Sequence, residues 1–319
     1  MKKSKVLVIG GAGFIGSHVV SSLLNEDFES VIVFDNLGRG DLAYLDDSLK
    51  DERCTFYSNG GDIRDIDILN DAMQGVDYVI HLAAMWLLHC KDFPRTAFHV
   101  NIEGTFNVLE ACVKNNVKRL VYSSSASVYG DAAEVPMTEG HPFNNKNFYG
   151  ATKIAGEAMC RAFYDRYGLD YVGLRYMNVY GPHQDQTAAY TGVIPIMLNK
   201  IDANEAPTIN GDGSQAYDFI DVRDVARCNV LALKSTATDE FYNVGTGVQT
   251  SIAELCDKIL ELRQSGLKVS YNPYSADDAR RMVQNRIGCP IKAKSELGFE
   301  YEIDLEKGLK DLIYWREAN

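Results

Sequence analysis

Short runs of β-branched and other apolar residues alternate with longer amphipathic stretches through the first half of the chain. The apolar runs predict strands at residues 5–10, 30–35, 77–84, 118–125 and 170–178. The stretches between them have helical spacing, at residues 14–25, 65–73, 95–115 and 148–167. Repeated strand–helix–strand units predict a parallel sheet with helices on both faces, because right-handed crossovers cover both faces. The predicted fold class is α/β, a Rossmann-type doubly wound sheet with a smaller α/β lobe.

The alternation weakens after about residue 180. Gly, Asn, Asp and Pro become frequent there, as in APTINGDGSQAYDF and YNPYSADDA. We therefore expect one domain over residues 1–178 and a smaller lobe that takes up most of residues 179–319. Apolar patterns at about 220–248 predict elements that return to the first domain, which makes the boundary discontinuous.

A glycine-rich turn follows the first predicted strand. GGAGFIG places Gly10, Gly13 and Gly16 three residues apart, directly before a predicted helix. Such a turn is tight, lets the backbone approach a pyrophosphate and packs the helix closely on its strand. Asp35 ends the second predicted strand 19 residues beyond Gly16, close to the spacing at which an acid bonds the adenosine ribose. The first domain is therefore predicted to bind a dinucleotide.

Three charged residues bear on the choice between NAD and NADP and on how the adenosine half is bound. Asp35 favours NAD over NADP, because a carboxylate accepts from a free 2′-hydroxyl and repels a 2′-phosphate. Arg39 could accommodate that phosphate, or it could be a solvated loop charge. Asp62 could reach the adenine edge, or it could cap the helix that begins near Asp65.

Tyr149 and Lys153 lie four positions apart in NFYGATKIAGE and would share one face of a helix. Three serines, Ser123 to Ser125, end the strand that precedes them in the chain. Ligands of an open parallel sheet bind at the carboxyl ends of its strands. A hydroxyl, a phenol and an ammonium group are therefore expected to meet beside the cofactor.

Together with these residues, several runs give the chain a resemblance to the extended short-chain dehydrogenase/reductase superfamily. The similarity is to its NAD-dependent sugar-nucleotide epimerase/dehydratase family, which includes UDP-glucose 4-epimerases. It covers nearly the whole chain. The runs are HLAA at 81–84, NIEGT at 101–105, RYMNVYGP at 175–182, DFIDVRD at 218–224, FYNVGTG at 241–247 and the closing LGFEYEIDLEKGLKDLIYW.

The resemblance implies site residues and their roles. The implied catalytic residues are Ser125, Tyr149 and Lys153. The implied cofactor-binding residues are Gly10, Gly13, Phe14, Ile15, Gly16, Asp35, Asn36, Asp62, Ile63, Leu82, Ala83, Ala84, Asn101, Ser123, Tyr149, Lys153 and Tyr176. The implied substrate-binding residues are Ser125, Tyr149, Asn178, Arg280, Arg281, Trp86 and His89, and Arg286 is a further candidate for the diphosphate. No metal is implied. Asn101 could instead be a buried asparagine that bonds local backbone.

The expected base is the Tyr149 phenol. Free tyrosine titrates near 10, so the group needs help to ionise near neutral pH. A neighbouring cation favours the phenolate, and we expect Lys153 and the positively charged nicotinamide to supply it. Ser125 would bond the reacting oxygen of the sugar.

The residues after Ser125 discriminate between reactions. In 4,6-dehydratases of this family an Asp-Glu pair usually stands there, but this chain has Ala126 and Ser127. The resemblance therefore implies C4 epimerisation of a nucleoside-diphosphate hexose, hexosamine or hexuronate. A 4,6-dehydratase or another oxidoreductase on the same substrates is the alternative, and a non-catalytic dinucleotide sensor is a further one.

Two departures from the family pattern concern the substrate. Tyr217 stands where the family commonly has an arginine, so one phosphate contact could be missing or could move to the later arginines. The segment Met85–Cys90 is unusually bulky, and Trp86, His89 and Cys90 would border the sugar pocket. Since neighbours in an extended segment point apart, His89 and Cys90 are not expected to act as a base and nucleophile.

Composition limits the partners. With 32 basic and 44 acidic residues, the net charge of −12 disfavours nucleic acid and anionic membranes. Seven scattered cysteines without a C-x-x-C pair indicate neither disulfides nor structural zinc, and they favour a reducing cytoplasm. No apolar run is long enough to span a bilayer, so we expect a soluble protein. The resemblance implies a nucleoside-diphosphate sugar as partner, most commonly a UDP-sugar, a role in polysaccharide biosynthesis, and a homodimer formed through residues 95–115 and 148–167.

Overall fold

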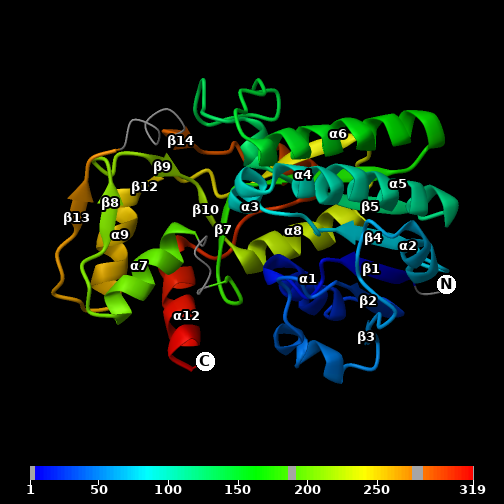
Figure 1. Ribbon diagram of the computed structural model, residues 1–319, viewed down its shortest axis with the longest axis horizontal. Helices are drawn as coiled ribbons and strands as arrows, with labels where there is room; N and C mark the ends of the chain where they lie inside the picture. The colour runs from blue at the N-terminus through cyan, green and yellow to red at the C-terminus, as the bar shows by residue number, and fades with distance from the viewer. Residues whose placement is uncertain (1–3, 186–191, 275–282, 319) are drawn as a thin grey trace.

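The computed structural model describes residues 4–185, 192–274 and 283–318, which form a larger domain and a smaller lobe beside it (Figure 1). A seven-stranded sheet in the order β11-β6-β5-β4-β1-β2-β3 forms the larger domain, and each neighbouring pair is parallel. The strands are β1 (Lys5–Ile9), β2 (Ser30–Phe34), β3 (Cys54–Phe56), β4 (Tyr78–His81), β5 (Arg119–Ser125), β6 (Tyr171–Tyr176) and β11 (Glu240–Val244). The predicted Rossmann-type α/β class is confirmed.

Two hydrophobic cores cover the two faces of this sheet. Helices α1 (Phe14–Leu24) and α8 (Val222–Lys234) pack on one face, and α2 (Ile66–Ala72), α5 (Gly104–Lys114) and α6 (Phe148–Tyr167) pack on the other. Strand β1 shows how the sequence produces this arrangement. Its valines at positions 6 and 8 belong to the first core, whereas Leu7 and Ile9 belong to the second. This is the two-residue period of a strand that is buried on both faces.

One predicted helix and one predicted extended segment differ from the structure. Residues 95–115 do not form one continuous helix, because α4 (Pro94–Ala97) passes into a π-helix at Phe98–Glu103 before α5 begins. Residues Leu87–Asp92 form a short helix, α3, and are not extended. The extended geometry expected around His89 was therefore wrong. A separate observation, the raised pKa of the Cys90 thiol, argues against a cysteine nucleophile.

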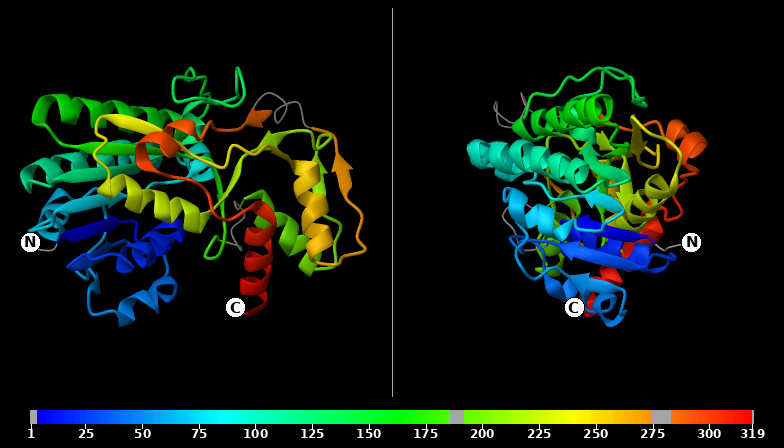
Figure 2. Two further views of the ribbon diagram at one scale, coloured as in Figure 1. Left: turned by 180° about the vertical axis from the view of Figure 1, so that it is seen from behind. Right: turned by 90° about the vertical axis from the view of Figure 1, so that its right-hand side faces the viewer.

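The smaller lobe is built around a third core. Three helices supply most of it: α7 (Val193–Asp202), α9 (Ile252–Leu262) and α12 (Leu305–Ala318). Short strands surround them, and Figure 2 shows this lobe from behind. The pairs are β7 (Asn178–Tyr180) with β10 (Phe219–Asp221), β8 (Thr208–Asn210) with β13 (Ser270–Asn272), and β9 (Ala216–Tyr217) between β12 (Thr250–Ser251) and β14 (Asn285–Arg286). Helix α11 (Ile291–Leu297) and 3₁₀ turns at Leu42–Leu45, Ser48–Lys50 and Ala126–Val128 complete the described elements.

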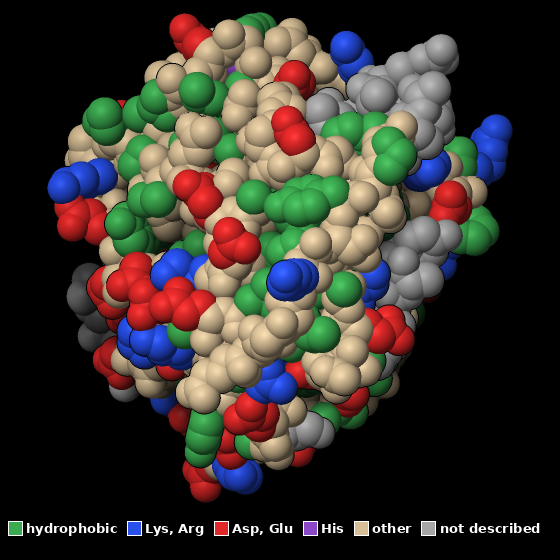
Figure 3. All heavy atoms as spheres, turned by 90° about the vertical axis from the view of Figure 1, so that its left-hand side faces the viewer, with side chains coloured by type: hydrophobic (Ala, Val, Ile, Leu, Met, Phe, Trp, Pro, Cys, Tyr) green, Lys and Arg blue, Asp and Glu red, His purple; other side chains and the backbone are tan. Residues whose placement is uncertain are grey.

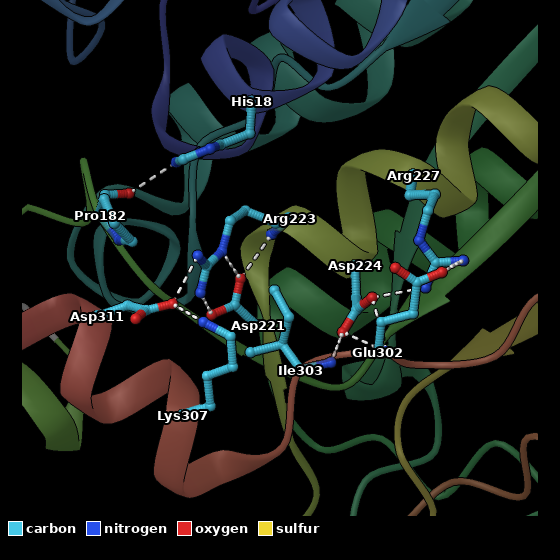
Figure 4. A network of polar contacts seen from close by, with 10 residues as sticks. All are labelled: His18, Pro182, Asp221, Arg223, Asp224, Arg227, Glu302, Ile303, Lys307 and Asp311. Atoms are coloured by element: carbon cyan, nitrogen blue, oxygen red, sulfur yellow. Dashed lines mark hydrogen bonds and ion pairs between the residues drawn. The ribbon is translucent and has the colours of Figure 1, made fainter.

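The two parts are joined by charged side chains at the start of α8 (Figure 4). Asp221 caps this helix and accepts hydrogen bonds from the backbone and guanidinium of Arg223. The same guanidinium reaches Asp311 on α12 at 2.8 Å. Asp224 accepts from the backbone N–H groups of residues 302 and 303, which lead into α12. The chain's last helix is thereby fixed against an element of the larger domain.

The outer face of the smaller lobe carries acidic and basic side chains side by side (Figure 3). Several of them form ion pairs between helices, such as Arg263 with Asp202 and Lys258 with Glu306. Within the described ranges, no helix combines the length and the apolar character that crossing a membrane requires.

Candidate active site

A pocket of about 860 Å³ opens at the carboxyl ends of the parallel strands. It lies where the strand order reverses between β1 and β4, which is the position at which open α/β sheets bind ligands. A second pocket of about 650 Å³ lies at the amino ends of the strands, at the opposite edge. Its basic groups are paired, for example Lys118 with Asp77 and Lys234 with Glu26. We therefore assign the chemistry to the first pocket.

The glycine turn forms the floor of this pocket. Gly10 has φ +81°, and a Cβ there would lie 2.8 Å from the backbone nitrogen of Ala83. A Cβ on Gly16 would lie only 2.0 Å from the carbonyl oxygen of Gly10, so this first turn of α1 packs on the loop without room for a side chain. Gly13 occupies the N-cap position and provides no side-chain hydrogen bond to the helix. The amino end of α1 is therefore open to an anion.

Asp35 and Arg39 lie at the adenosine end that the sequence predicts. Asp35 accepts hydrogen bonds from the backbone N–H groups of Ala12 and Leu37, at 3.0 and 2.8 Å, and its side chain also lines the pocket. Burial raises the pKa of this carboxyl. Arg39 also lines the pocket with its side chain 41% exposed, and both roles considered for it stay predictions. Its guanidinium lies 3.1 Å from Asp185 and 4.8 Å above the ring of Trp86.

The structure bears on the alternative roles predicted for Asp62 and Asn101. Asp65 caps α2, so the alternative role of Asp62 as that cap was wrong; Asp62 lines the pocket and pairs with Arg64. Asn101 is buried and is not among the residues that line the pocket. Its amide accepts from the N–H of Met85 at 2.6 Å and donates to Thr152 at 3.1 Å. Asn101 therefore braces α6 beside Lys153 and does not contact the cofactor space.

Tyr149 and Lys153 project from the first turns of α6. Asn147 caps this helix through a 2.8 Å bond to the N–H of Gly150, which fixes where the helix begins. The ammonium nitrogen of Lys153 lies 5.7 Å from the centre of the Tyr149 ring and donates to the carbonyl of Ser123 at 2.5 Å. Both side chains line the pocket. The i, i+4 spacing thus brings phenol and ammonium to one wall.

Burial shifts the pKa values of both members of this pair. Burial raises the pKa of Tyr149 to about 12, although a hydrogen bond with Ser125 and the charge of Arg286 act to lower it. Burial also lowers the pKa of Lys153 to about 8. Loss of water around the phenol outweighs the hydrogen bond with Ser125 and the charge of Arg286, so the phenol is neutral near pH 7 when no further positive charge is present. The prediction of a phenolate combined the charge of Lys153 with that of bound nicotinamide, so it stays a prediction for the protein with NAD bound.

The three serines at the end of β5 have three different partners. Ser123 holds Lys153 through its carbonyl, and Ser124 donates to Glu157 at 2.5 Å. Ser125 bonds Ser127 at 3.2 Å and is the serine that reaches Tyr149. Ser124 is therefore committed to the ion pair that Glu157 forms with Arg175, and Ser125 is left for the catalytic tyrosine.

The residues expected around the sugar are spread over both parts of the molecule. Asn178 begins β7, and its backbone N–H donates to the carbonyl of Asp218. Tyr217 lies opposite Arg286 in the β9–β14 pair, and its hydroxyl donates to the carbonyl of Val283 at 2.9 Å. Arg280 and Arg281 fall outside the described residues.

Trp86 and His89, expected beside the sugar, line the same pocket as the glycine turn. Their rings meet edge to face, with centroids 6.0 Å apart. Cys90 follows them on α3 and is fully buried. Burial raises the pKa of its thiol to about 11, which leaves too little thiolate for nucleophilic chemistry. The Cys90 side chain is therefore a neutral thiol near pH 7 and is not suited to covalent catalysis.

The pocket fits NAD on features of its own. Glycines without room for a Cβ form the floor, the amino end of α1 has no side-chain cap, and Asp35 faces the space 19 positions after Gly16. Sixteen of the seventeen expected cofactor residues line it, all except Asn101. Bound NAD would supply a hydride acceptor and a positive charge next to the Tyr149 phenol. Within the described residues, no three His, Cys, Asp or Glu side chains gather as a metal site.

Comparison with known sequences places this geometry in a family. Residues 6–245 match the sequence profile of the NAD dependent epimerase/dehydratase family. The chain belongs to that family.

Similar proteins within the family include both kinds of enzyme. A UDP-N-acetylglucosamine 4-epimerase from Methanobrevibacter ruminantium M1, solved with UDP-N-acetylmuramic acid, is 33% identical, with a TM-score of 0.92 and coverage of 100% of this chain and 99% of that one. A UDP-glucose 4-epimerase from Thermotoga maritima, solved with UDP-glucose, is 34% identical, with a TM-score of 0.90 and coverage of 98% and 99%. A dTDP-glucose 4,6-dehydratase from an Actinoplanes species is 31% identical, over 99% of this chain and 98% of its own.

Several pocket residues of this epimerase/dehydratase family member were missed from sequence. Tyr44 stacks on His183 with ring centroids 4.4 Å apart, and Gln184 and Asp185 follow on the same loop. This loop comes directly after RYMNVYGP, so its position in the chain was a usable signal. Nothing in the sequence places Tyr44 there, because it comes from a 3₁₀ turn of the larger domain.

Proposed function

We propose that the protein interconverts the C4 stereoisomers of a nucleoside-diphosphate sugar through a 4-keto intermediate. The observation that carries this proposal is the group formed by Ser125, Tyr149 and Lys153 beside the pocket, with no acid at the two positions after the serine. Those positions hold Ala126 and Ser127, both buried, and Ser127 is bonded to Ser125. One base suffices to remove and return the C4 hydroxyl proton, whereas dehydration needs a further acid and base.

In this mechanism Tyr149 takes the proton of the C4 hydroxyl as the hydrogen on C4 leaves as hydride, for which bound NAD would be the acceptor. Tyr149 gives the proton back when the hydride returns to the other face of C4. Ser125 bonds the same oxygen and keeps it in line with the phenol. Lys153 is anchored by the carbonyl of Ser123 and holds its positive charge beside the tyrosine ring. Since burial keeps the free phenol neutral, the base forms only after positive charge is added to the site.

The relatives support a nucleotide-sugar substrate, and UDP-sugars are the substrates we propose first. Two of the similar structures are 4-epimerases solved with UDP-sugars. The similarity to dTDP-glucose 4,6-dehydratases makes dehydration the second candidate. The buried Ala126 is the observation against it.

The test is incubation of the purified protein with UDP-, dTDP- and GDP-sugars, followed by separation of stereoisomers and mass measurement. Epimerisation leaves the mass unchanged, whereas dehydration removes one water. Transient nicotinamide absorbance on mixing would accompany turnover. A protein that binds the sugars but converts none of them would be a dinucleotide sensor, and the proposal would be wrong.

We also propose a homodimer in the cytoplasm that serves polysaccharide biosynthesis. Exposed aromatic side chains lie on α5 and α6, among them Phe106 at 41% and Tyr167 at 58% exposure. All seven cysteines are free thiols, as a reducing compartment would keep them. A monomer mass from light scattering at micromolar concentration would refute the proposed dimer.

A further inference from the structure

A buried ion pair lies behind the residues that are proposed to carry out the reaction. Glu157 on α6 and Arg175 on β6 are 4% and 3% exposed. The guanidinium donates two hydrogen bonds to the carboxylate, from Nε at 2.9 Å and from Nη2 at 2.7 Å. Neither of these two residues lines the 860 Å³ pocket. The pair can therefore act on the site only through other residues.

Helix α6 places the carboxylate in line with the proposed catalytic groups. Glu157 follows Tyr149 and Lys153 at the same four-residue spacing. Residues four positions apart project from one side of a helix, so Glu157 lies one turn beyond Lys153. The helix thus carries the proposed base, its neighbouring cation and the buried carboxylate along one side.

Ser124 connects this carboxylate to the strand that ends at the site. The serine is 1% exposed, and its hydroxyl donates to Oε1 of Glu157 at 2.5 Å. Arg175 lies directly opposite Ser124 in the parallel β5–β6 pair and donates to the same oxygen. A serine, an arginine and a glutamate therefore meet at one point, each from a different element.

The neighbours of Ser124 on β5 are the residues through which this strand takes part in the site. The carbonyl of Ser123 accepts the hydrogen bond of the Lys153 ammonium at 2.5 Å. Ser125 supplies the hydroxyl that is proposed to bond the reacting oxygen. Planar peptide units join the three serines, so fixing the middle side chain restricts the backbone on both sides of it.

The guanidinium of Arg175 is bonded at its other end as well. Its Nη1 donates to the hydroxyl of Tyr129 at 2.8 Å and to the carbonyl of Glu139 at 2.9 Å. The donors of a guanidinium have a fixed planar geometry, so bonds at both ends fix the position of the carboxylate that it holds. Glu157 therefore presents its acceptor to Ser124 at a defined place.

Stability alone does not require a buried ion pair at this position. Replacing such a pair by apolar side chains of similar volume is often neutral or stabilising, because both charges lose their water when they are buried. What two apolar side chains could not supply is an acceptor for the Ser124 hydroxyl.

We propose that Glu157, held by Arg175, is a positioning residue that sets the end of β5 against α6 through the Ser124 hydroxyl. It keeps the carbonyl before Ser124 on the Lys153 ammonium and the hydroxyl after it beside Tyr149. This inference rests on the proposed function and adds the residues that align its catalytic groups. Alignment matters to the rate, because a misplacement of about 1 Å can lower it by about 100-fold.

The first variant that tests this role is Ser124→Ala, which removes the connection and leaves the ion pair intact. Tyr171→Phe is the matched control, because it also removes one buried hydroxyl that donates to a carboxylate. That carboxylate belongs to Asp239, at 2.7 Å, and the pair lies at the opposite end of the same sheet. The kcat and KM for UDP-sugars, the NAD affinity and the free energy of unfolding are measured for both variants and the wild type.

We expect kcat to fall by about 10- to 100-fold in Ser124→Ala, because the catalytic groups lose their alignment. The NAD affinity and KM should stay close to the wild type, since the groups that contact either ligand are unchanged. Tyr171→Phe should keep the wild-type kcat. A wild-type kcat in Ser124→Ala would overturn the inference, and so would equal losses of kcat in both variants, which would indicate an effect of stability alone.

The double variant Glu157→Met/Arg175→Met separates positioning from stability. It removes both charges together and leaves neither unpaired, so we expect it to fold. Because Ser124 loses its acceptor, kcat should fall as far as in Ser124→Ala, and adding Ser124→Ala should cause no further loss. A folded double variant with the wild-type kcat would overturn the inference. If the double variant does not fold, Ser124→Ala decides.

A measurement without sugar distinguishes failure of this inference from failure of the proposed function. In protein with isotope-labelled lysine, the ammonium resonance of Lys153 is identified by its loss in Lys153→Met. Its exchange with water should be faster in Ser124→Ala than in the wild type, because the ammonium loses its fixed acceptor, and unchanged in Tyr171→Phe. Unchanged exchange in Ser124→Ala would overturn the inference. Faster exchange in a protein that converts no sugar would refute the proposed function and leave the positioning role standing.

Discussion

The two sides of Tyr149 are built in different ways. The cofactor side is made by the glycine turn, Asp35 and the ends of β4 and β5, all within one sheet. The proposed sugar side lies where the turn after Ser125 meets β14, which comes about 160 positions later in the chain. On the cofactor side Asp35 accepts two backbone hydrogen bonds, and Arg39 pairs with Asp185. On the other side, the guanidinium of Arg286 lies 3.5 Å from the carbonyl of Gly130 and forms no ion pair with a described carboxylate.

This difference corresponds to two tasks of the site, which are cofactor binding and sugar recognition. A cofactor cradle made of backbone and one carboxylate holds a constant molecule, so it can be rigid and complete. A sugar site assembled between two parts can change its specificity through single side chains of the smaller lobe. Tyr149 belongs to both sides, and changes on either side should therefore affect different measurable quantities.

Removing the shared group should have the largest effect. Tyr149→Phe takes away the base and should lower kcat by about 10²- to 10⁴-fold, the usual contribution of a general base. NAD binding should change little, because the cradle is untouched. Tyr167→Phe, an exposed tyrosine on the same helix, is the matched control. Turnover within a few-fold of the wild type would refute the proposed role of Tyr149.

The next effect should be confined to the cofactor side. Gly16→Ala places a Cβ 2.0 Å from the carbonyl oxygen of Gly10, so the loop must move. We expect NAD affinity to fall by about 100-fold, the upper part of the usual cost of overpacking. Gly266→Ala meets no atom within 4 Å and serves as control. Fluorescence titration with NAD measures both, and unchanged affinity in Gly16→Ala would show that the cradle does not contact the cofactor.

Asp35→Asn should have a smaller effect on the same side. It removes the charge and one of two acceptors that now hold Ala12 and Leu37. NAD affinity should fall by about 10-fold, as for a lost hydrogen bond to a charged group, and discrimination against NADP should narrow. Competition between the two dinucleotides measures this. If Asp35→Asn kept the wild-type preference for NAD over NADP, the selectivity would come from Arg39 and not from Asp35.

The smallest effect concerns stability and pH. Burial lowers the pKa of Lys153 from 10.5 to about 8, so the unfolded chain holds more protons than the folded protein between these values. Stability from this group therefore rises with pH across that window and is lowest below pH 8. Urea unfolding at pH 8 and pH 9.5 should show a smaller rise in Lys153→Met than in the wild type. Equal slopes would mean that Lys153 titrates normally in the folded protein.

Short sequence patterns predicted much of the fold and of the cofactor site. Apolar runs that alternate with helical stretches predicted the parallel sheet, because strands buried on both faces are apolar along their whole length. The spacing of Gly10, Gly13, Gly16 and Asp35 predicted a nucleotide-binding turn. These features depend on neighbours in sequence. The helix over 95–115 was predicted as one piece because apolar spacing does not distinguish an α-helix from one interrupted by a π-helical segment.

The sequence by itself determined the sheet, the turn that fits a dinucleotide and the pairing of Tyr149 with Lys153 on one helical face, because backbone geometry and short spacing dictate them. Only the tertiary structure decided the protonation of that pair, since the pKa depends on how much water the folded chain removes. It also decided the placing of Arg286 beside the catalytic turn, because that contact joins distant segments whose meeting no local pattern records.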